Sequence, residues 1–280
     1  MKDQKSKIDM KFTALKPLWP LWPLNPFYPF KILFMQLFVT DFKIKWSEVF
    51  IENKEILDQI RKVLRLKIWD RIFIQDLSCQ KRHEIEIINR DDEIITWKIV
   101  QTLICKSKEE WLRWMIVCMP NKWDKIELIT QKLTEIWMNE IIFWPSERSV
   151  IKEWNQKKEE RLNKITKEAV EQSRWRTIPN IVFTTDIKKY LNNVEVIVFD
   201  KEATSCKPQA KSHKSDKLCW LVWPEWWLTT KDYGNLEWID YKVQNLWENV
   251  LRTETAAIVG GRVIKNYELW ALPTGRQVMS

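Results

Sequence analysis

Apolar positions in the first part of the chain follow the short period of β-strands. Four apolar runs separated by polar turns predict strands, at residues 36–39, 71–76, 83–89 and 93–103. Apolar residues at helical spacing predict one short helix over 53–66: Ile56, Ile60, Val63 and Leu64. Short strands with one small helix predict a small β-barrel that begins near Met35.

The second part of the chain alternates between strand and helix patterns. Strand runs are expected at 112–119, 140–143, 181–183, 194–199, 218–222 and 241–246. Helices are expected over 126–136, after a cap at Asn155, after a cap at Thr229 or Thr230, and over 253–269. This alternation predicts an α/β domain with a largely parallel sheet.

A charged and polar segment at 106–113 separates the two patterns. We place the boundary near Ser107, which gives one domain over 35–107 and a second over 108–272. Residues 1–34 are expected to be a non-native or disordered extension, because proline recurs at every third position from Pro17 to Pro29. A signal peptide is the competing interpretation, since lysines precede an apolar stretch, but five prolines make a poor apolar core for one.

The chain has 19 Trp and only 4 Gly, whereas a chain of average composition and this length has about 20 Gly. Many Trp stand where the pattern requires glycine: at turns (Trp69, Trp97), after a helix (Trp137) and in the segment Trp223-Pro-Glu-Trp-Trp227. We therefore predict that the source reads the UGA codon as glycine. The alternative is a protein in which these indoles are real. Trp144, Trp154 and Trp220 lie in contexts that do not demand glycine.

Net charge and the number of reactive residues restrict the classes of function that the chain can have. The net charge is +8, and half of it belongs to residues 1–34, so the rest is mildly basic and compatible with RNA. Five scattered Cys without a C-x-x-C pair favour a reducing compartment. Two isolated His, His83 and His213, are too few for a His-based metal site or a Ser-His-Asp relay. The chain contains no apolar run of 18 or more residues, so no membrane-spanning helix is predicted.

Two segments near the carboxyl end join a strand to a helix through a glycine-rich loop, once Trp is read as Gly. The first runs from the strand 218–222 through G-P-E-G-G at 223–227 to a Thr-capped helix. The second is N-L-G-E-N-V-L-R-T-E-T-A-A at 245–257. Open α/β sheets bind ligands at such strand ends, so the two loops predict a cofactor site.

These two segments resemble the signature of the ribosomal RNA small subunit methyltransferase E family. Other pieces match in the same order: the helix K-I-E-L-I-T-Q-K-L-T-E at 125–135, S-E-R-S at 146–149 and E-A-V-E-Q-S at 168–173. The resemblance covers roughly Met35 to Leu269. It implies an α/β fold with a carboxyl-terminal SPOUT trefoil-knot methyltransferase domain, preceded by a PUA-like RNA-binding barrel.

The resemblance also implies a cytoplasmic homodimer that uses S-adenosylmethionine, without a metal, to methylate uridine N3 in small-subunit ribosomal RNA. It implies that these residues line the cofactor pocket: Trp223, Glu225, Trp226, Trp227, Leu246, Trp247, Leu251 and Arg252. Methyl transfer needs positioning and removal of the N3 proton. Arg252 is expected to orient the uracil or a phosphate and to favour the uridine anion, and Glu254 either assists catalysis or caps the last helix.

Arg148, Lys152, Arg174 and Arg176 are candidates for RNA phosphate contacts, although separate charges also suit a solvated face. Two other functions remain open. One is a SPOUT methyltransferase that acts on another RNA position, such as a ribose hydroxyl. The other is a non-catalytic RNA-binding protein, if the indoles at 223, 226 and 227 are real and fill the pocket.

Overall fold

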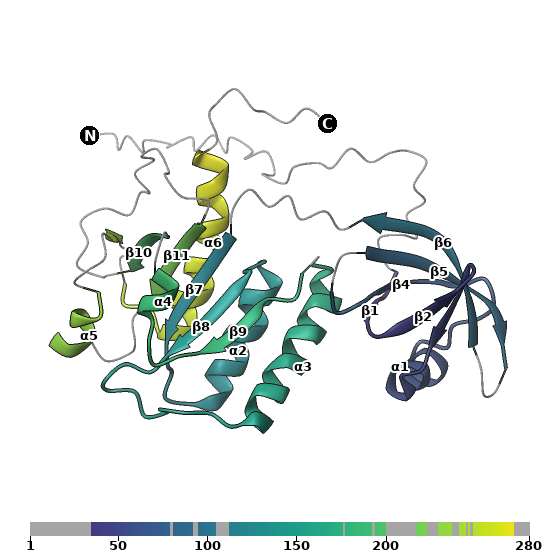
Figure 1. Ribbon diagram of the computed structural model, residues 1–280, viewed down its shortest axis with the longest axis horizontal. Coiled ribbons are helices and arrows are strands. Elements are labelled where there is room, and N and C mark those ends of the chain that lie inside the picture. Colours follow the sequence, from purple (N-terminus) through teal and green to yellow (C-terminus); the bar gives the residue numbers. More distant parts are fainter. Residues whose placement is uncertain are drawn as a thin grey trace, which may run out of the picture. The chain divides into compact units, whose positions relative to one another are not determined.

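The computed structural model describes residues 35–78, 81–91, 95–104, 112–175, 177–191, 194–199, 217–222, 229–236, 241–244, 246 and 249–271 (Figure 1). Residues from Gln36 onward form one compact unit. The predicted extension over 1–34 lies outside the described residues. Within the described ranges, every helix is too short or too polar to cross a lipid bilayer.

The first sheet contains β1 (Leu37–Val39), β2 (Phe42–Lys45), β3 (Glu48–Ile51), β4 (Arg71–Gln75), β5 (Lys81–Arg90) and β6 (Ile95–Ile104). The strands lie in the order β1-β4-β5-β6-β3-β2, and all neighbours are antiparallel except β1 and β4. The hairpin of β2 and β3 is absent from the sequence prediction. Three residues of β2 are exposed, so this strand lacks the apolar run that identifies a buried strand.

The predicted helix over 53–66 is confirmed, with a change of geometry along its length. Asn53 caps α1 (Lys54–Asp58) by accepting a hydrogen bond from the backbone N–H of Ile56 at 3.3 Å. The chain then continues as the π-helical turn η2 (Gln59–Val63). Ile56 and Ile60 are buried in the core of the first sheet, as the apolar spacing predicts, but Val63 of the same predicted set is 71% exposed.

The predicted glycine turn at Trp97 is wrong. Trp97 lies inside β6, paired with Val49 of β3 and Ile87 of β5, and it is fully buried. Ile95, Trp97 and Ile99 alternate with polar neighbours and point into the same core, which is the period of a strand. The turn prediction failed because the alternating burial of side chains determines the conformation of this segment, and a glycine-like residue at 97 does not by itself produce a turn.

The second sheet contains β7 (Leu112–Cys118), β8 (Glu140–Trp144), β9 (Asn180–Phe183), β10 (Glu195–Phe199), β11 (Lys217–Val222) and β12 (Tyr241–Gln244). The order is β12-β10-β11-β7-β8-β9, and each neighbouring pair is parallel. The predicted parallel α/β sheet is therefore confirmed.

Helices cover both faces of the second sheet (Figure 1). One face packs against α2 (Trp123–Glu135), α3 (Gln156–Ser173) and α6 (Thr253–Ala271), through a core that includes Leu133, Leu162 and Ala257. The other face packs against α4 (Lys188–Leu191) and the region of α5 (Thr230–Gly234), through Leu191 and Leu236. The predicted caps at Asn155 and Thr229 both form, with bonds to the N–H groups of Lys158 and Asp232.

Helix α2 ends in a left-handed turn at Trp137, where φ is 74°. The N–H of Trp137 donates to the carbonyl of Thr134, and that of Met138 donates to the carbonyl of Leu133, both at 3.1 Å. This pair of bonds is the Schellman motif, and Trp137 occupies the position at which glycine is favoured. The predicted left-handed helix end is confirmed.

Left-handed backbone recurs at other tryptophans. Of the five non-glycine residues with positive φ in the described ranges, three are Trp46 (61°), Trp69 (77°) and Trp137. Trp46 is fully exposed in the hairpin between β2 and β3, and Trp69 is exposed in a turn before β4. Bulky residues are genuine outliers in this region, so the backbone is one that favours glycine at these positions.

Candidate functional site

The carboxyl ends of neighbouring strands meet along one edge of the second sheet. Val222 at the end of β11 pairs with Val117 of β7, and Cys118 at the end of β7 pairs with Trp144 at the end of β8. Phe199 at the end of β10 pairs with Gln244 at the end of β12. The chain segments that leave these ends therefore start close together, and this edge is where open parallel sheets bind ligands.

Two of these segments carry the predicted cofactor residues. Trp223, Glu225, Trp226, Trp227 and Trp247 lie outside the described residues. The remaining three are described: Leu246 and Leu251 are half-buried, and Arg252 is exposed. Leu246 packs against the core beneath α2 and α6. The described part of the predicted cofactor set is thus two half-buried leucines and one exposed arginine.

Arg252 directly precedes α6, and its position is set by the start of that helix. Its carbonyl accepts the backbone N–H of Ala256 at 2.8 Å, while its neighbour Thr253 is buried. The backbone of Arg252 is thereby fixed, and its exposed guanidinium is accessible to a ligand. This arrangement suits a cation that orients an anionic or polar group.

Glu254 lies in the first turn of α6 and faces α2. Its carboxylate is 3.4 Å from the ammonium group of Lys125, and both side chains are largely buried. A carboxylate near a helix amino terminus is also stabilised by the helix dipole. The contact gives Glu254 a structural partner, which sequence spacing did not reveal.

The S-E-R-S segment forms a tight turn after β8. Ser146 and Ser149 are buried and share a hydrogen bond of 2.9 Å between their hydroxyls. The ammonium group of Lys152 donates to the carbonyls of Ser146 and Glu147, at 2.5 Å and 2.7 Å. Lys152 and Arg148, both predicted phosphate ligands, are both exposed, but the ammonium group of Lys152 holds this turn, whereas no bond of the Arg148 side chain is described.

Arg174 ends α3 in a left-handed conformation, with φ of 56°. Its carbonyl and that of Trp175 accept hydrogen bonds from the guanidinium of Arg82 in β5, at 3.1 Å and 3.0 Å. Nearby, Glu171 accepts the backbone N–H of Val39 at 2.8 Å, and burial raises the pKa of this carboxyl group. Arg176 lies outside the described residues. The end of α3 is thus bonded to β1 and β5.

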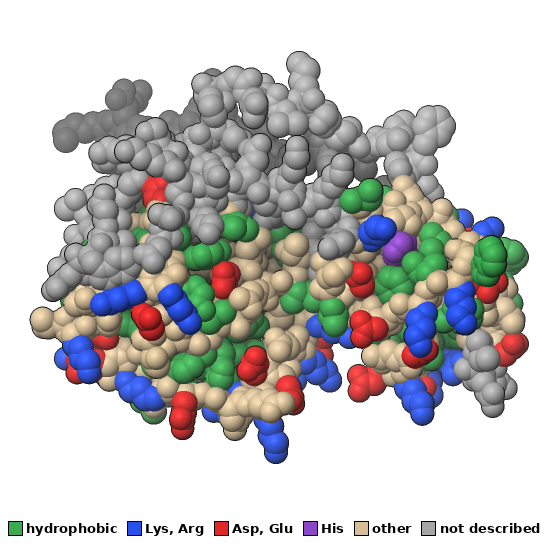
Figure 2. Space-filling view, in the orientation of Figure 1, with side chains coloured by type: hydrophobic (Ala, Val, Ile, Leu, Met, Phe, Trp, Pro, Cys, Tyr) green, Lys and Arg blue, Asp and Glu red, His purple; other side chains and the backbone are tan. Residues whose placement is uncertain are grey.

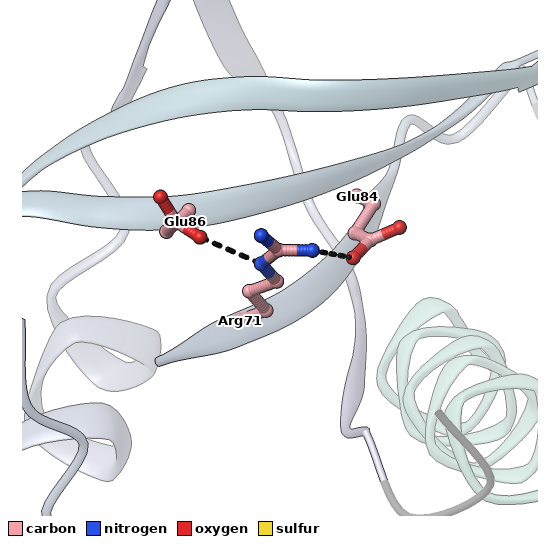
Figure 3. Close-up of polar contacts among 3 residues, drawn as sticks. All are labelled: Arg71, Glu84 and Glu86. Atoms are coloured by element: carbon pink, nitrogen blue, oxygen red, sulfur yellow. Dashed lines mark hydrogen bonds and ion pairs between the residues drawn. The ribbon is translucent and has the colours of Figure 1, made fainter. Parts of the chain in front are cut away.

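Arg71, Glu84 and Glu86 form an ion cluster on the first sheet (Figure 3). The guanidinium of Arg71 in β4 donates to Glu86 at 2.6 Å and to Glu84 at 3.1 Å. These bonds raise the pKa of Arg71. The cluster joins β4 to β5, and since two carboxylates surround one guanidinium, its formal charge is −1 and Arg71 is occupied by these partners.

Charges on the visible face of the molecule are mixed. Among the described side chains that Figure 2 shows, Lys and Arg are interspersed with Asp and Glu and form no continuous basic area. Within the described ranges, no group of three His, Cys, Asp or Glu could hold a metal ion. The expected absence of a metal stays a prediction.

Comparisons with known proteins identify the family of the chain. The family model for the RNA methyltransferase domain matches residues 108–265. The ribosomal RNA small subunit methyltransferase E of Bacillus subtilis is 26% identical over 239 residues, which is 79% of this chain and 91% of that protein.

Solved structures share the fold at lower identity. The ribosomal RNA small subunit methyltransferase E of Neisseria gonorrhoeae, bound to S-adenosylmethionine, superposes with a TM-score of 0.67 at 19% identity, covering 83% of this chain and 97% of that one. A protein of Legionella pneumophila assigned as a methyltransferase, also with bound S-adenosylmethionine, gives 0.65 at 16%, with coverage of 83% and 97%. The strand-end site, the match over 108–265 and the curated relative together show that this chain belongs to the RNA methyltransferase family and confirm its resemblance to the methyltransferase E group.

Proposed function

We propose that this RNA methyltransferase transfers a methyl group from S-adenosylmethionine to N3 of a uridine in small-subunit ribosomal RNA. The observation that carries the proposal is the shared edge of the second sheet, where β11 and β12 lead into the two segments with the signature residues. The Bacillus subtilis relative is named for small-subunit ribosomal RNA, and two structures of the same fold contain S-adenosylmethionine.

The described residues fit such a cofactor. Half-buried Leu246 and Leu251 offer an apolar surface suited to an adenine ring, and both lie beside segments that leave strand ends. Residues 223–227 would hold the rest of the cofactor if their backbone carries no bulky side chains. S-adenosylmethionine supplies an electrophilic methyl group, and the protein supplies alignment and charge.

Arg252 acts on the base in this proposal. Methylation of N3 requires that its proton passes to an acceptor, here solvent water, which leaves negative charge on the uracil ring until the new N–C bond forms and S-adenosylhomocysteine leaves. The exposed guanidinium of Arg252, whose backbone is held at the start of α6, would favour that charge beside the ring, so Arg252 is the proposed catalytic residue. Glu254 is the second candidate, and its contact with Lys125 favours the structural role over proton transfer.

Glycine at many tryptophan positions is part of the proposal. Trp46, Trp69 and Trp137 adopt the backbone conformation that glycine prefers, which supports reading UGA as glycine in the source. The codons at 46, 69, 137, 223, 226, 227 and 247 test this directly. UGG at 223, 226 and 227 would place three indoles beside the cofactor and favour a non-catalytic RNA-binding protein.

The decisive experiment uses the full chain with Trp223→Gly, Trp226→Gly, Trp227→Gly and Trp247→Gly. We expect calorimetry to detect S-adenosylmethionine binding, and mass spectrometry of treated ribosomal RNA to detect N3-methyluridine. A methylated ribose would instead support the alternative target. Absence of cofactor binding would exclude the enzyme reaction.

Three further properties follow from the resemblance and belong to the proposal. They are a trefoil knot in the second domain, a PUA-like barrel built on the first sheet, and a cytoplasmic homodimer. Light scattering coupled to size-exclusion chromatography tests the dimer, and a monomer at micromolar concentration would contradict it.

A further inference from the structure

The turn after β8 is anchored by two buried serines. The backbone N–H of Ser149 donates to the carbonyl of Ser146 at 3.1 Å, which closes a turn with Glu147 and Arg148 at its centre. The two serine hydroxyls bond to each other at 2.9 Å, and that of Ser149 also donates to the carbonyl of Met119 after β7, at 3.4 Å. The turn is therefore tied to the ends of both β7 and β8.

Asp232 of α5 holds the same turn from a distant segment of the chain. It is buried, with 3% of the residue exposed, and its Oδ1 accepts the backbone N–H of Glu147 at 2.8 Å. Its Oδ2 accepts from Thr229 and completes the capping box of α5, so the cap does not need the bond to Glu147. Bonds to a carboxylate are stronger than those to a neutral acceptor. Asp232 therefore fixes the backbone on the amino side of Arg148.

Arg148 is the exposed cation at the centre of this turn. Among the described residues, its side chain makes no hydrogen bond or ion pair, whereas the ammonium group of Lys152 is bonded to the carbonyls of Ser146 and Glu147. A turn that only connects β8 to α3 does not require a buried carboxylate, because water can satisfy exposed peptide groups. Fixing the backbone beside one exposed guanidinium is the arrangement expected of a group that is preorganised for a ligand.

Arg148 and Arg252 lie near the carboxyl ends of neighbouring strands. Arg148 follows β8, which pairs with β7. Arg252 precedes α6, whose first turn meets the first turn of α2 through Glu254 and Lys125, and α2 follows β7. An RNA strand that places a base at Arg252 is therefore also close to the end of β8.

We propose that Asp232 is a positioning residue for the RNA substrate, because it holds Arg148 where the guanidinium binds a phosphate of the RNA strand. This inference rests on the proposed function, which places RNA at this edge. The planar guanidinium matches the oxygens of a phosphate in a bidentate contact. The formal charges of Glu147 and Arg148 cancel, so the placement of the guanidinium, and not the net charge of the turn, favours the phosphate. A backbone that is already fixed also lowers the ordering cost of binding.

The test is a double-mutant cycle on RNA binding by the full chain that carries glycine at 223, 226, 227 and 247. Arg148→Ala and Asp232→Ala are made singly and together, and fluorescence anisotropy gives the Kd for a fragment of small-subunit ribosomal RNA. Thr229→Ala is the matched control, because it weakens the cap of α5 but leaves the bond between Oδ1 of Asp232 and the N–H of Glu147. Tm is measured for every variant.

We expect Arg148→Ala to weaken RNA binding about tenfold in the parent, as loss of a charge-assisted contact implies. Asp232→Ala should weaken it about fivefold, and adding Arg148→Ala to that variant should change the Kd by less than about twofold, because the two residues act through one contact. Thr229→Ala should stay within about twofold of the parent. A purely structural role of Asp232 predicts that the two effects multiply. Multiplied effects, or an unchanged Kd in Arg148→Ala or in Asp232→Ala, overturn the inference.

Ser149→Ala replaces Asp232→Ala if the latter does not fold. It removes the hydroxyl that joins the turn to Ser146 and Met119, so it loosens the same turn from its other end. Arg148→Ala should again lose most of its effect in that background, and a full tenfold effect there overturns the inference. If the parent protein binds no ribosomal RNA, the proposed function itself fails before any variant is compared.

Discussion

The carboxylate of Glu254 and the ammonium group of Lys125 lie 3.4 Å apart and join the first turns of α6 and α2. Both side chains are largely buried, so removal of either leaves a charge without this partner. We expect Glu254→Gln and Lys125→Met each to lower the free energy of unfolding. In a double-mutant cycle the two effects should be non-additive, with a coupling of about 1 kcal/mol. Additive effects in urea unfolding would show that the two side chains are not coupled, and would favour the catalytic role of Glu254 over the structural one.

Arg148 and Lys152 should respond differently to substitution, although both are predicted RNA ligands. Arg148 is exposed, so Arg148→Ala should weaken RNA binding and reduce the slope of log Kd against log salt by about 1. Lys152 holds two carbonyls, so Lys152→Met should lower the free energy of unfolding by about 2 kcal/mol. Salt titrations of RNA binding and chemical unfolding are measured for both variants. Equal free energies of unfolding of the two variants would contradict the structural role of Lys152.

Trp46→Gly should stabilise the protein. Trp46 has φ of 61° and is fully exposed, so the substitution relieves backbone strain and loses no packing. We expect the free energy of unfolding to rise by about 1 kcal/mol. Trp46→Ala keeps the strained backbone and should change it by less than about 0.5 kcal/mol. Thermal unfolding of the two variants separates strain from the loss of an indole.

Stability should fall in mild acid through His83. Burial, and next the charge of Lys81, lower the pKa of His83 below its ordinary value of 6.5. The unfolded chain therefore binds the proton more readily, and His83 contributes stability above pH 6.5 that is lost as the pH falls toward the folded pKa. The difference in unfolding free energy between the wild type and His83→Gln should shrink over that window. A constant difference would show that His83 does not titrate on unfolding.

Gly260→Ala should destabilise the protein. A Cβ atom at Gly260 would lie 2.4 Å from the ring of Phe199, so α6 or the end of β10 must shift. We expect a loss of about 1–3 kcal/mol. At Gly234 no atom lies within 4 Å of an added Cβ, so Gly234→Ala is the matched control and should be neutral or slightly stabilising. Denaturant unfolding compares the two.

Sequence patterns predicted most of the fold because the second sheet is built from continuous apolar runs. The caps at Asn155 and Thr229 and the left-handed residue Trp137 were each predicted from local chemistry. The exposed strand β2 and the burial of Trp97 in a strand were not predicted, because tertiary contacts with neighbouring strands determine the conformation of both segments.

The candidate site was less accessible to sequence reasoning. The signature loops predict a site at the carboxyl edge of the sheet, and this stays a prediction. The bonds of Lys152 to the turn after β8 depend on the local backbone, and the bond of Asp232 joins residues 85 positions apart. Only the spacing of Thr229 and Asp232, three residues apart as in a capping box, could have drawn attention to the carboxylate. Its bond to Glu147 has no sequence signal.

The place of β7 in the second sheet has a consequence for synthesis on the ribosome. β7 is the first strand of the second sheet in chain order, but on one side it pairs with β11. Leu112 therefore cannot pair on that side until Lys217 has been synthesised. Until the last quarter of the chain has emerged, β7 presents an unpaired edge to the cell, and edges of this kind recruit other strands. Late pairing of distant segments is also slow. The nascent protein is therefore most vulnerable to aggregation just before its signature segments are made, and a pause in translation there would lengthen that exposure.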